Sequence, residues 1–355
     1  MSPDTLGIRC MLMRGGTSKG AFFLKEDLPA DPVERDALLL RVMGSPDPRQ
    51  IDGVGGGHPL TTKVAVVSVS DRDDADLEYL FLQVAVDRPE VSERQNCGNM
   101  LAAVGPFALE RKLIKADDDR VSVRILMRNT GGRALASFPV DDGRPVYAGD
   151  TEISGVPGAA AEIRIGFEDI AGSSSGSLLP TGQAVDTVEG VEATLIDNGM
   201  PVVVLRAADV GVSGYESCED LEANDDLGRR LEAIRLACGP LMNLGDVTST
   251  TVPKLTLVSP PRGGGAISTR TFIPHRCHQA IGVLGAVSVA TACLLPGTPA
   301  GGMADLRPQS DVVRLEHPSG SFDAWVRLDG TGVASAGIVR TARKLMDGTV
   351  FPRRY

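Results

Sequence analysis

Aromatic residues and basic charge are both scarce in this sequence. Only 4% of its 355 residues are aromatic, and the formal net charge is −10. Proteins that bind nucleic acids need aromatic side chains on which bases stack, or a basic face that follows the phosphates. We therefore expect no nucleic acid among the partners of this protein, although a local group of donors could still bind a small anion.

Long hydrophobic runs and paired cysteines are also missing. The longest strongly apolar run, Ile281 to Leu295, is too short to span a bilayer comfortably, and the start MSPDTLGIRC lacks the basic-then-apolar pattern of a signal peptide. The spacings of the six cysteines form neither a paired metal motif nor a disulfide framework. These absences predict a cytoplasmic protein with reduced thiols and no membrane partner.

Glycine and proline, in contrast, are plentiful. The 41 glycines and 23 prolines follow no period, which favours many turns and short strands over a helical bundle. Short apolar strands separated by turns are predicted along 8–24, 121–167 and 191–212. An amphipathic helix is predicted at 31–43, where Asp31 suits the N-cap and Pro32 the first helical position.

One stretch, ERQNCGNMLAAVGPFALERKL from Glu93 to Leu113, is the candidate centre of the fold. Cys97 is predicted at or near the first turn of an apolar helix, which Pro106 should kink or split. A helix start carries unpaired N–H groups, binds a carboxylate and favours the ionised form of a thiol placed there. A buried cysteine that caps a core helix is an equally good interpretation, because free cysteines are often simply buried.

Two other positions combine polar groups with apolar segments. RGGTSKG at 14–20 places Thr17 and Ser18 in a Gly-rich turn that could bind an anion, although it lacks the P-loop spacing and could be only a tight hairpin. Lys63 precedes the buried strand VAVVSVS. A lysine there usually extends to solvent, but burial can lower its pKa and make it a base.

The two halves of the chain resemble each other weakly. Gln95, Cys97, Gly98 and Ala102 align with Gln279, Ile281, Gly282 and Ala286, and KVAVVS from Lys63 aligns with KLTLVS from Lys254. This repeat predicts two similar domains, each a sheet around a buried helix, with both helix starts facing one cleft. Two anion sites in one cleft suit a di- or tricarboxylate. Because the repeat aligns Cys97 with Ile281, which has no thiol, only one of the two helix starts would offer a thiol for proton transfer.

Six motifs resemble those of the PrpF-like isomerases, a group related to diaminopimelate epimerase. They are RGGTSKG at 14–20, MGSPDPRQIDGVGG at 43–56, QNCGNMLAAVGPFALERKL at 95–113, IDNGMPV at 196–202, MNLGDVTSTTVPK at 242–254 and IPHRCHQAIGVLGAVSVATACL at 273–294. Within the group the chain is most similar to the 4-oxalomesaconate tautomerases, and the similarity covers nearly the whole chain.

The resemblance implies an α+β fold of two similar domains. Each would be a mixed β-sheet or barrel curled around a central buried helix, with the active site in the interdomain cleft. We place the N-terminal domain at 1–185 plus 340–355 and the C-terminal domain at 186–339, with the Gly/Ser-rich 172–183 as the candidate junction. The family's lysine and cysteine fall on Lys63 and Cys97, which would move protons without a cofactor.

The same resemblance implies a tautomerase or 1,3-allylic isomerase of 4-oxalomesaconate in gallate and protocatechuate degradation. The alternatives are an isomerase of 2-methylaconitate or aconitate in the propionate pathway, and a non-catalytic accessory of an aconitase-like enzyme. The substrate would be a small tricarboxylate, and a homodimer is the candidate assembly. Which of Lys63 and Cys97 is the base stays open.

Further residues are expected to bind the substrate carboxylates. They are Thr17, Ser18, Gly98, Asn99, Arg276 and Gly282. Arg276 could instead pair with a nearby acid, and Lys254 could be structural or contact a carboxylate.

His275, Cys277 and His278 lie close together, but the sequence offers no convincing further ligands, so no metal is expected. Gly57-His58 and Arg128 depart from the family's pattern, and Arg128 could alter carboxylate contacts.

Overall fold

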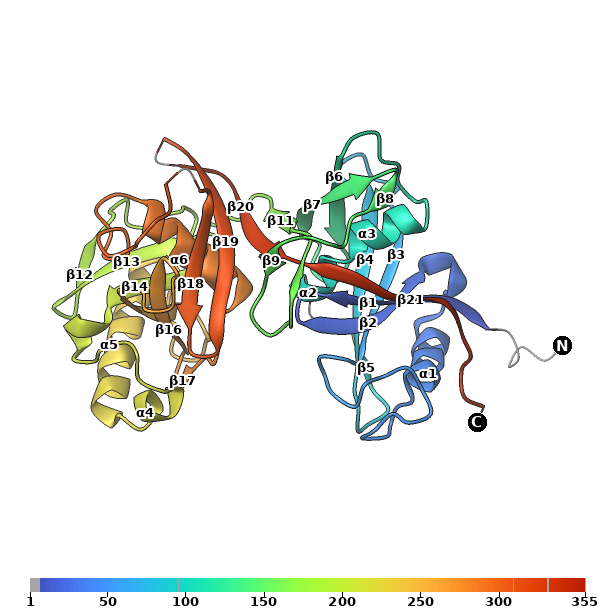
Figure 1. The fold of residues 1–355 in the computed structure, drawn as a ribbon. Helices are drawn as coiled ribbons and strands as arrows, with labels where there is room; N and C mark the ends of the chain where they lie inside the picture. Colours follow the sequence, from blue (N-terminus) through green and yellow to red (C-terminus); the bar gives the residue numbers. More distant parts are fainter. Residues whose placement is uncertain (1–6, 95, 309, 331, 355) are drawn as a thin grey trace. The chain divides into compact units, whose positions relative to one another are not determined.

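The computed structural model describes residues 7–94, 96–308, 310–330 and 332–354 (Figure 1). Gln95, a member of the aligned repeat, lies outside these residues. The chain forms two compact units: unit 1 runs to Gly166 and resumes at Val339, and unit 2 is Phe167–Ile338. Within the described ranges, no helix is both long and apolar enough to cross a membrane.

Unit 1 combines short helices with many strands. Its elements are β1 (Ile8–Gly15), β2 (Ser18–Leu24), η2 (Lys25–Asp27), α1 (Pro32–Met43), β3 (Lys63–Val69), β4 (Leu77–Val84), β5 (Val91–Ser92), α2 (Gly98–Leu101), α3 (Val104–Glu110), β6 (Arg120–Met127), β7 (Arg133–Asp141), β8 (Arg144–Pro145), β9 (Thr151–Glu152), β10 (Ala159–Ala160), β11 (Ile163–Phe167) and β21 (Ala342–Val350).

Unit 2 has the same mixture of elements. They are β12 (Asp186–Val188), β13 (Val191–Asp197), β14 (Pro201–Arg206), η3 (Ala207–Val210), α4 (Cys218–Glu222), α5 (Asp225–Leu241), β15 (Lys254–Ser259), β16 (Ile267–Ile273), β17 (Arg276–Cys277), α6 (Val283–Leu294), β18 (Val312–His317), β19 (Gly320–Asp329) and β20 (Gly332–Arg340), the last of which ends in unit 1.

Both units follow one strand topology, so the predicted internal repeat and the α+β class are confirmed. In unit 1, β1 pairs antiparallel with β2, β2 parallel with β3, β3 antiparallel with β4, β4 parallel with β6, and β6 antiparallel with β7. In unit 2, β13, β14, β15, β16, β18 and β19 repeat this sequence of pairings in the same order. Lys63 and Lys254 each open the third strand of their series.

The sheet of unit 1 has a helix on each face. Because side chains alternate along a strand, Phe23, Val64 and Leu82 point to one face and form a core with Leu39 of α1. Phe22 points to the opposite face, where its ring centroid lies 5.5 Å from that of Phe107 in α3. α3 contacts β3, β7 and β8, and α2 contacts β1 and β2.

The helix of the central stretch is split into two segments, as its proline predicts. α2 ends at Leu101, and α3 begins at Val104 with Pro106 as its third residue. Proline lacks an N–H group and its ring clashes with the preceding turn, so a continuous helix through this point is disfavoured. Helix α1 also begins as predicted: Asp31 accepts hydrogen bonds from the N–H groups of Val33 and Glu34, at 2.9 and 3.0 Å.

Helix α6 is the counterpart of this helix in unit 2, and it is continuous. Residues Gly285 to Cys293 are buried, and α6 contacts β13, β14, β18 and β19. The all-round apolar sequence predicts such burial. α5 covers the other side, where Leu231 and Ile234 pack with strand residues such as Leu255.

The boundary between the units differs from the one expected at 185, because residues 167–185 belong to unit 2. The Oδ2 atom of the buried Asp197 accepts hydrogen bonds from Ser174 N, at 2.8 Å, and from Ser175 N and Oγ, at 2.9 and 3.0 Å. Asn243 Nδ2 donates to Ser175 O at 2.9 Å. The Gly/Ser-rich segment is therefore a loop fixed within unit 2 by a buried carboxylate, and the junction precedes it.

Candidate active site

Lys63 is a buried lysine on the face of the sheet that α2 and α3 cover. It opens β3, where its Cα pairs with Gly20 on β2 and with Gln83 on β4. The residue is 7% exposed, and its Nζ lies 4.9 Å from the centroid of the Phe81 ring. Burial lowers the pKa of Lys63, and the nearby Cys97 acts in the opposite direction. The amine is thus desolvated and within electrostatic reach of the thiol.

Cys97 is the N-cap residue of α2 and is half-buried. Its carbonyl oxygen accepts a hydrogen bond of 3.3 Å from the hydroxyl of Tyr79 on β4. Tyr79 is fully buried, and burial raises its pKa well above the usual value, so it is a neutral donor. The predicted place of Cys97 at a helix start is confirmed, although α2 itself is only 4 residues long.

The Gly-rich turn between β1 and β2 packs directly on the start of α2. A Cβ atom on Gly15 would lie 2.4 Å from Asn99 O, and one on Gly16 would lie 2.2 Å from Asn99 Oδ1. Only glycine permits so close an approach. Asn99 Nδ2 donates to Thr17 Oγ1 at 3.0 Å, and Arg340 Nε donates to Asn99 Oδ1 at 3.2 Å. The turn, the helix start and the C-terminal segment are thereby locked together.

Two buried polar atoms of this region have no hydrogen-bond partner among the described residues. They are Ser18 Oγ, in a residue only 2% exposed, and Asn96 Oδ1. Buried polar groups are normally satisfied, because an unpaired one costs about 1–3 kcal/mol. An unpaired hydroxyl beside the Gly-rich turn and an unpaired acceptor beside Cys97 are groups that a polar ligand could satisfy.

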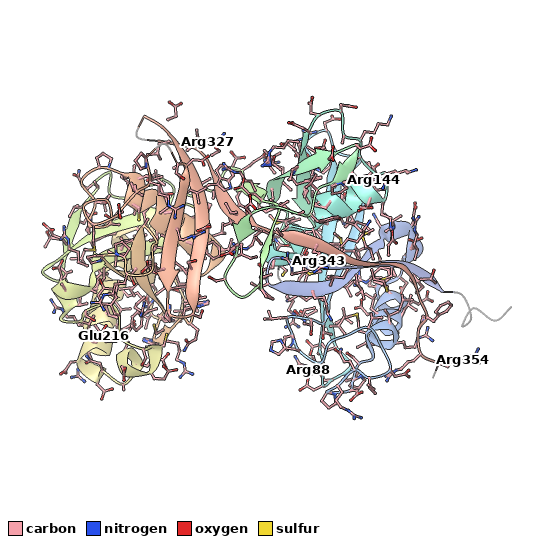
Figure 2. All side chains as sticks on the ribbon, viewed as in Figure 1. Arg88, Arg144, Glu216, Arg327, Arg343 and Arg354 are labelled. Atoms are coloured by element: carbon pink, nitrogen blue, oxygen red, sulfur yellow. The ribbon has the colours of Figure 1, made fainter. Side chains whose placement is uncertain are left out.

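Arg14 stabilises the turn. Its Nη1 donates to Gly16 O, at 2.9 Å, and to the carbonyl and hydroxyl oxygens of Thr341, at 3.0 and 2.9 Å. Arg343, which is labelled in Figure 2, belongs to β21 and is the partner of Arg14 in the strand register. Burial, together with this second guanidinium, lowers the pKa of Arg14.

The structure brings six of the eight expected site residues together in unit 1 and places the other two in unit 2. Gly282 is the N-cap residue of α6, as predicted for the second helix start. Arg276 is on β17, where its side chain is 83% exposed and its Nη1 lies 3.6 Å from Glu222 Oε2. Lys254 Nζ donates to Thr251 O, and burial, with a contribution from Arg235, lowers the pKa of this lysine.

Comparison with known proteins assigns the family. The family model described as PrpF protein matches residues 5–353. The chain belongs to the PrpF family. It is 59% identical to a (4E)-oxalomesaconate Delta-isomerase from Novosphingobium sp. (strain KA1) over 96% of each chain. It is also 59% identical to a 4-oxalomesaconate tautomerase from Pseudomonas putida over 97% of this chain and 95% of the relative.

A solved structure shares the fold. The crystal structure of a methylitaconate-delta-isomerase superposes with a TM-score of 0.86 at 34% sequence identity, and the match covers 98% of this chain and 96% of that one. The fold class expected from the PrpF motifs is thereby confirmed.

His275, Cys277 and His278, the His/Cys cluster of unit 2, each contact other groups of the protein. Among the residues that the structure describes, no group of three or more His, Cys, Asp or Glu side chains could hold a metal ion. His275 Nδ1 lies 3.8 Å from Glu232 Oε2, and His278 Nδ1 accepts a hydrogen bond of 2.8 Å from Ala280 N. Cys277 is buried, and its backbone N–H donates to Glu222 Oε1 at 2.9 Å.

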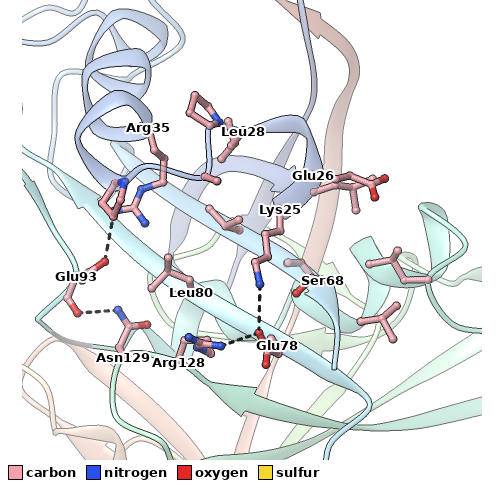
Figure 3. A pocket seen from close by; sticks show the side chains of 18 residues that line it. Lys25, Glu26, Leu28, Arg35, Ser68, Glu78, Leu80, Glu93, Arg128 and Asn129 are labelled. Carbon is pink, nitrogen blue, oxygen red and sulfur yellow. Dashed lines mark hydrogen bonds and ion pairs between the residues drawn. The ribbon is translucent and has the colours of Figure 1, made fainter. Parts of the chain in front are cut away.

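Arg128 lines a separate cavity of about 890 Å³ in unit 1 (Figure 3). Its Nη1 donates to Glu78 Oε2 at 2.9 Å, and Lys25 Nζ lies 3.9 Å from the same oxygen. None of the expected site residues lines this cavity.

Asn129, the residue after Arg128, donates to Phe81 O and Glu93 O, at 2.8 and 2.7 Å, and so fixes the backbone at Glu93, four residues before Cys97.

Three residues of the site were missed by the sequence analysis. Gln83 Oε1 accepts a hydrogen bond of 2.6 Å from Lys63 Nζ; a polar amide within the apolar run LEYLFLQVAV was the available signal. Tyr79 lies on the same strand, four residues before Gln83, so both side chains point to the same face of the sheet. Arg340 had no such signal, because it reaches Asn99 across 241 positions of sequence through the return of the chain to unit 1.

Proposed function

We propose that this protein is a cofactor-independent isomerase of 4-oxalomesaconate. The observation that carries the proposal is the pairing of a buried, pKa-lowered lysine with a thiol at the start of the central helix. Two groups of this kind can remove a proton from one carbon and deliver one elsewhere. The substrate assignment is supported by two relatives, each 59% identical to this chain over nearly its full length, whose names specify oxalomesaconate.

Lys63 and Cys97 are the proposed catalytic residues. One of them takes a proton from the carbon next to the conjugated carbonyl and carboxyl groups, and the C–H electron pair moves into the conjugated system. The resulting dienolate accepts a proton at the far end of that system or on oxygen, which completes a 1,3-shift or a tautomerisation. No atom is gained or lost and no electron is transferred, so the reaction needs no co-substrate.

The remaining site residues are proposed to hold carboxylates and the developing negative charge. Ser18 offers a buried hydroxyl without a partner, and Thr17 and Asn99 are already ordered by their mutual hydrogen bond. The N–H groups of Gly98 and Asn99 belong to the first turn of α2, where they have no acceptor within the helix. Donors of this type stabilise an oxyanion when they are fixed before the reaction. Arg276 and Gly282 are proposed carboxylate contacts from unit 2.

A spectroscopic and NMR assay on 4-oxalomesaconate in D₂O tests the proposal. Wild-type protein should change the absorbance and incorporate deuterium at carbon, and the deuterated position separates the tautomerisation from the allylic shift. Lys63→Met and Cys97→Ser should each lower kcat by about 10²- to 10⁴-fold, the range for a lost proton-transfer group. Lys63→Arg should be equally impaired, because a guanidinium does not give up its proton.

Lys115→Met is the matched control, since Lys115 is an exposed lysine outside the site, and it should keep wild-type activity. Absence of turnover by a well-folded wild type would sink the oxalomesaconate assignment. Turnover of 2-methylaconitate instead would establish the alternative isomerase, and activation of an aconitase-like enzyme without any turnover would establish the accessory function.

We also propose that the protein acts in the cytoplasm as a homodimer. The six cysteines are free, as expected for a reducing compartment. Sedimentation analysis of the purified protein would test the dimer.

A further inference from the structure

Gln83 contacts the proposed catalytic lysine from the neighbouring strand. The two residues form a directly opposed antiparallel pair, so their side chains leave the sheet on the same face. Gln83 Oε1 accepts a hydrogen bond of 2.6 Å from Lys63 Nζ. This contact is local to β3 and β4 and needs no other part of the chain.

The orientation of the Gln83 amide is fixed by its other end. Its Nε2 donates to Thr62 O at 2.9 Å, Pro59 O at 3.2 Å and Val84 O at 3.3 Å. Carbonyl oxygens can only accept, so the NH₂ group must face them and the amide oxygen must face the amine. The amide therefore holds the nitrogen of Lys63 at a set position relative to the backbone of residues 59–62, which precedes β3.

The hydrogen-bond partner of Lys63 Nζ is a neutral amide. Cys97 at the N-cap of α2 has an electrostatic effect on it. Tyr79 on β4 stays uncharged because burial raises its pKa. Lys19 on β2 precedes Gly20, the strand partner of Lys63, and therefore points to the opposite face. A carboxylate in the place of Gln83 would hold the ammonium form, whereas an amide oxygen accepts a hydrogen bond from either form.

We propose that Gln83 is a positioning residue that fixes the Lys63 amine with a neutral acceptor and thereby leaves it free to gain and lose a proton during turnover. The proposal rests on the proposed function for its catalytic meaning. It holds for either role of Lys63, because a base and an acid both cycle between amine and ammonium.

Competitive labelling of Lys63 with acetic anhydride across pH, read by peptide mass spectrometry, tests the proposal without any substrate. Only the unprotonated amine reacts, so the pH midpoint of labelling reports the lysine pKa. In Gln83→Glu the midpoint should move to higher pH, because a carboxylate favours the ammonium. In Gln83→Met it should move to lower pH, because the charged form loses an acceptor.

Kinetics supply the second readout. Both variants should lower kcat by about tenfold or more, with KM changed by less than about threefold, since the lost interaction positions a reacting group. The pH limb that belongs to Lys63 should move in the direction of its labelling midpoint. Gln183→Glu adds the same charge at an exposed position of unit 2 and should match the wild type in both assays.

Equal labelling midpoints in wild type, Gln83→Glu and Gln83→Met would overturn the proposal, as would shifts in one direction for both variants. Gln83→Met keeps the test open if the glutamate variant fails to fold, which thermal unfolding by circular dichroism would reveal. Shifted midpoints in a protein that does not turn over oxalomesaconate would sink the substrate assignment and leave the role of Gln83 intact.

Discussion

Arg111 is a cation buried beneath the last strand of unit 1. Its side chain is 2% exposed, and its two terminal nitrogens bind the carboxylate of Asp347 on β21 at 2.8 and 2.7 Å. The Cζ atom of its guanidinium also lies 5.4 Å from the centroid of the Phe107 ring in α3. A buried charge that loses its partner is strongly destabilising, so this ion pair fastens the end of the central helix to β21.

Asp347→Asn should therefore lower the free energy of unfolding by about 2 kcal/mol at neutral pH, less than for a fully buried pair because water reaches the carboxylate. Arg111 holds the pKa of Asp347 below its usual value. The stabilisation is thus complete above the ordinary aspartate pKa, about 4, and is lost as pH falls through the lower folded-state value. Urea unfolding of the wild type and of Asp347→Asn would be measured from neutral pH down through the folded-state pKa of Asp347. The difference between their free energies of unfolding should shrink as the pH falls; a constant difference would contradict the assignment.

At the scale of the elements, the contact between β2, β3 and α2 depends on one glycine. A Cβ atom on Gly20 would lie 2.3 Å from Lys63 O and 2.5 Å from Met100 Cε. Because the first of these is a backbone atom, a side chain here must push the strands apart. The strand that carries Lys63 would then shift with respect to the helix that begins at Cys97.

Gly20→Ala should destabilise the protein by about 1–3 kcal/mol, the usual cost of overpacking, and should lower kcat as well. Gly348→Ala is the matched control: it also changes a strand glycine, but no atom lies within 4 Å of its added Cβ. Thermal melts and steady-state kinetics of the pair would check this. Equal behaviour of the two variants would show that the close approach at Gly20 is unimportant.

The sequence predicts elements well where local chemistry decides them. Asp31 and Pro32 mark the start of α1, Pro106 marks the break between α2 and α3, and the apolar run marks the buried α6. The position of Cys97 at a helix start follows from the same local signals. Gln83 and Tyr79 escape such analysis because only the β3–β4 register brings them to Lys63 and Cys97.

Arg340 and the junction between the units show the limit of sequence analysis more plainly. The contact of Arg340 with Asn99 depends on the path of the chain through all of unit 2. The Gly/Ser-rich segment has the composition of a linker, yet Asp197 binds it within unit 2 through three hydrogen bonds. Composition describes what a segment can do alone, whereas a buried carboxylate elsewhere decides what it does in the fold.

At the scale of the whole molecule, unit 2 is one continuous segment with its own buried helix and core. We predict that a fragment of residues 167–338 folds cooperatively on its own, because a segment of this size can bury a sufficient core. It should show a single urea transition and dispersed amide NMR signals, and it should have no isomerase activity, since Lys63 and Cys97 are absent. A fragment without a cooperative transition would show that unit 2 depends on unit 1.

The pairing of β21 with β1 also sets an order of events during translation. Residues 342–350 emerge from the ribosome only after all of unit 2, yet they line the first strand of unit 1 along its length from Ile8 to Gly15. Domains usually fold from the N-terminus onward as they are synthesised. Unit 2 can therefore complete its fold before unit 1. In the sheet that holds Lys63, strand β1 lacks its β21 partner until the last strand of the chain has been synthesised.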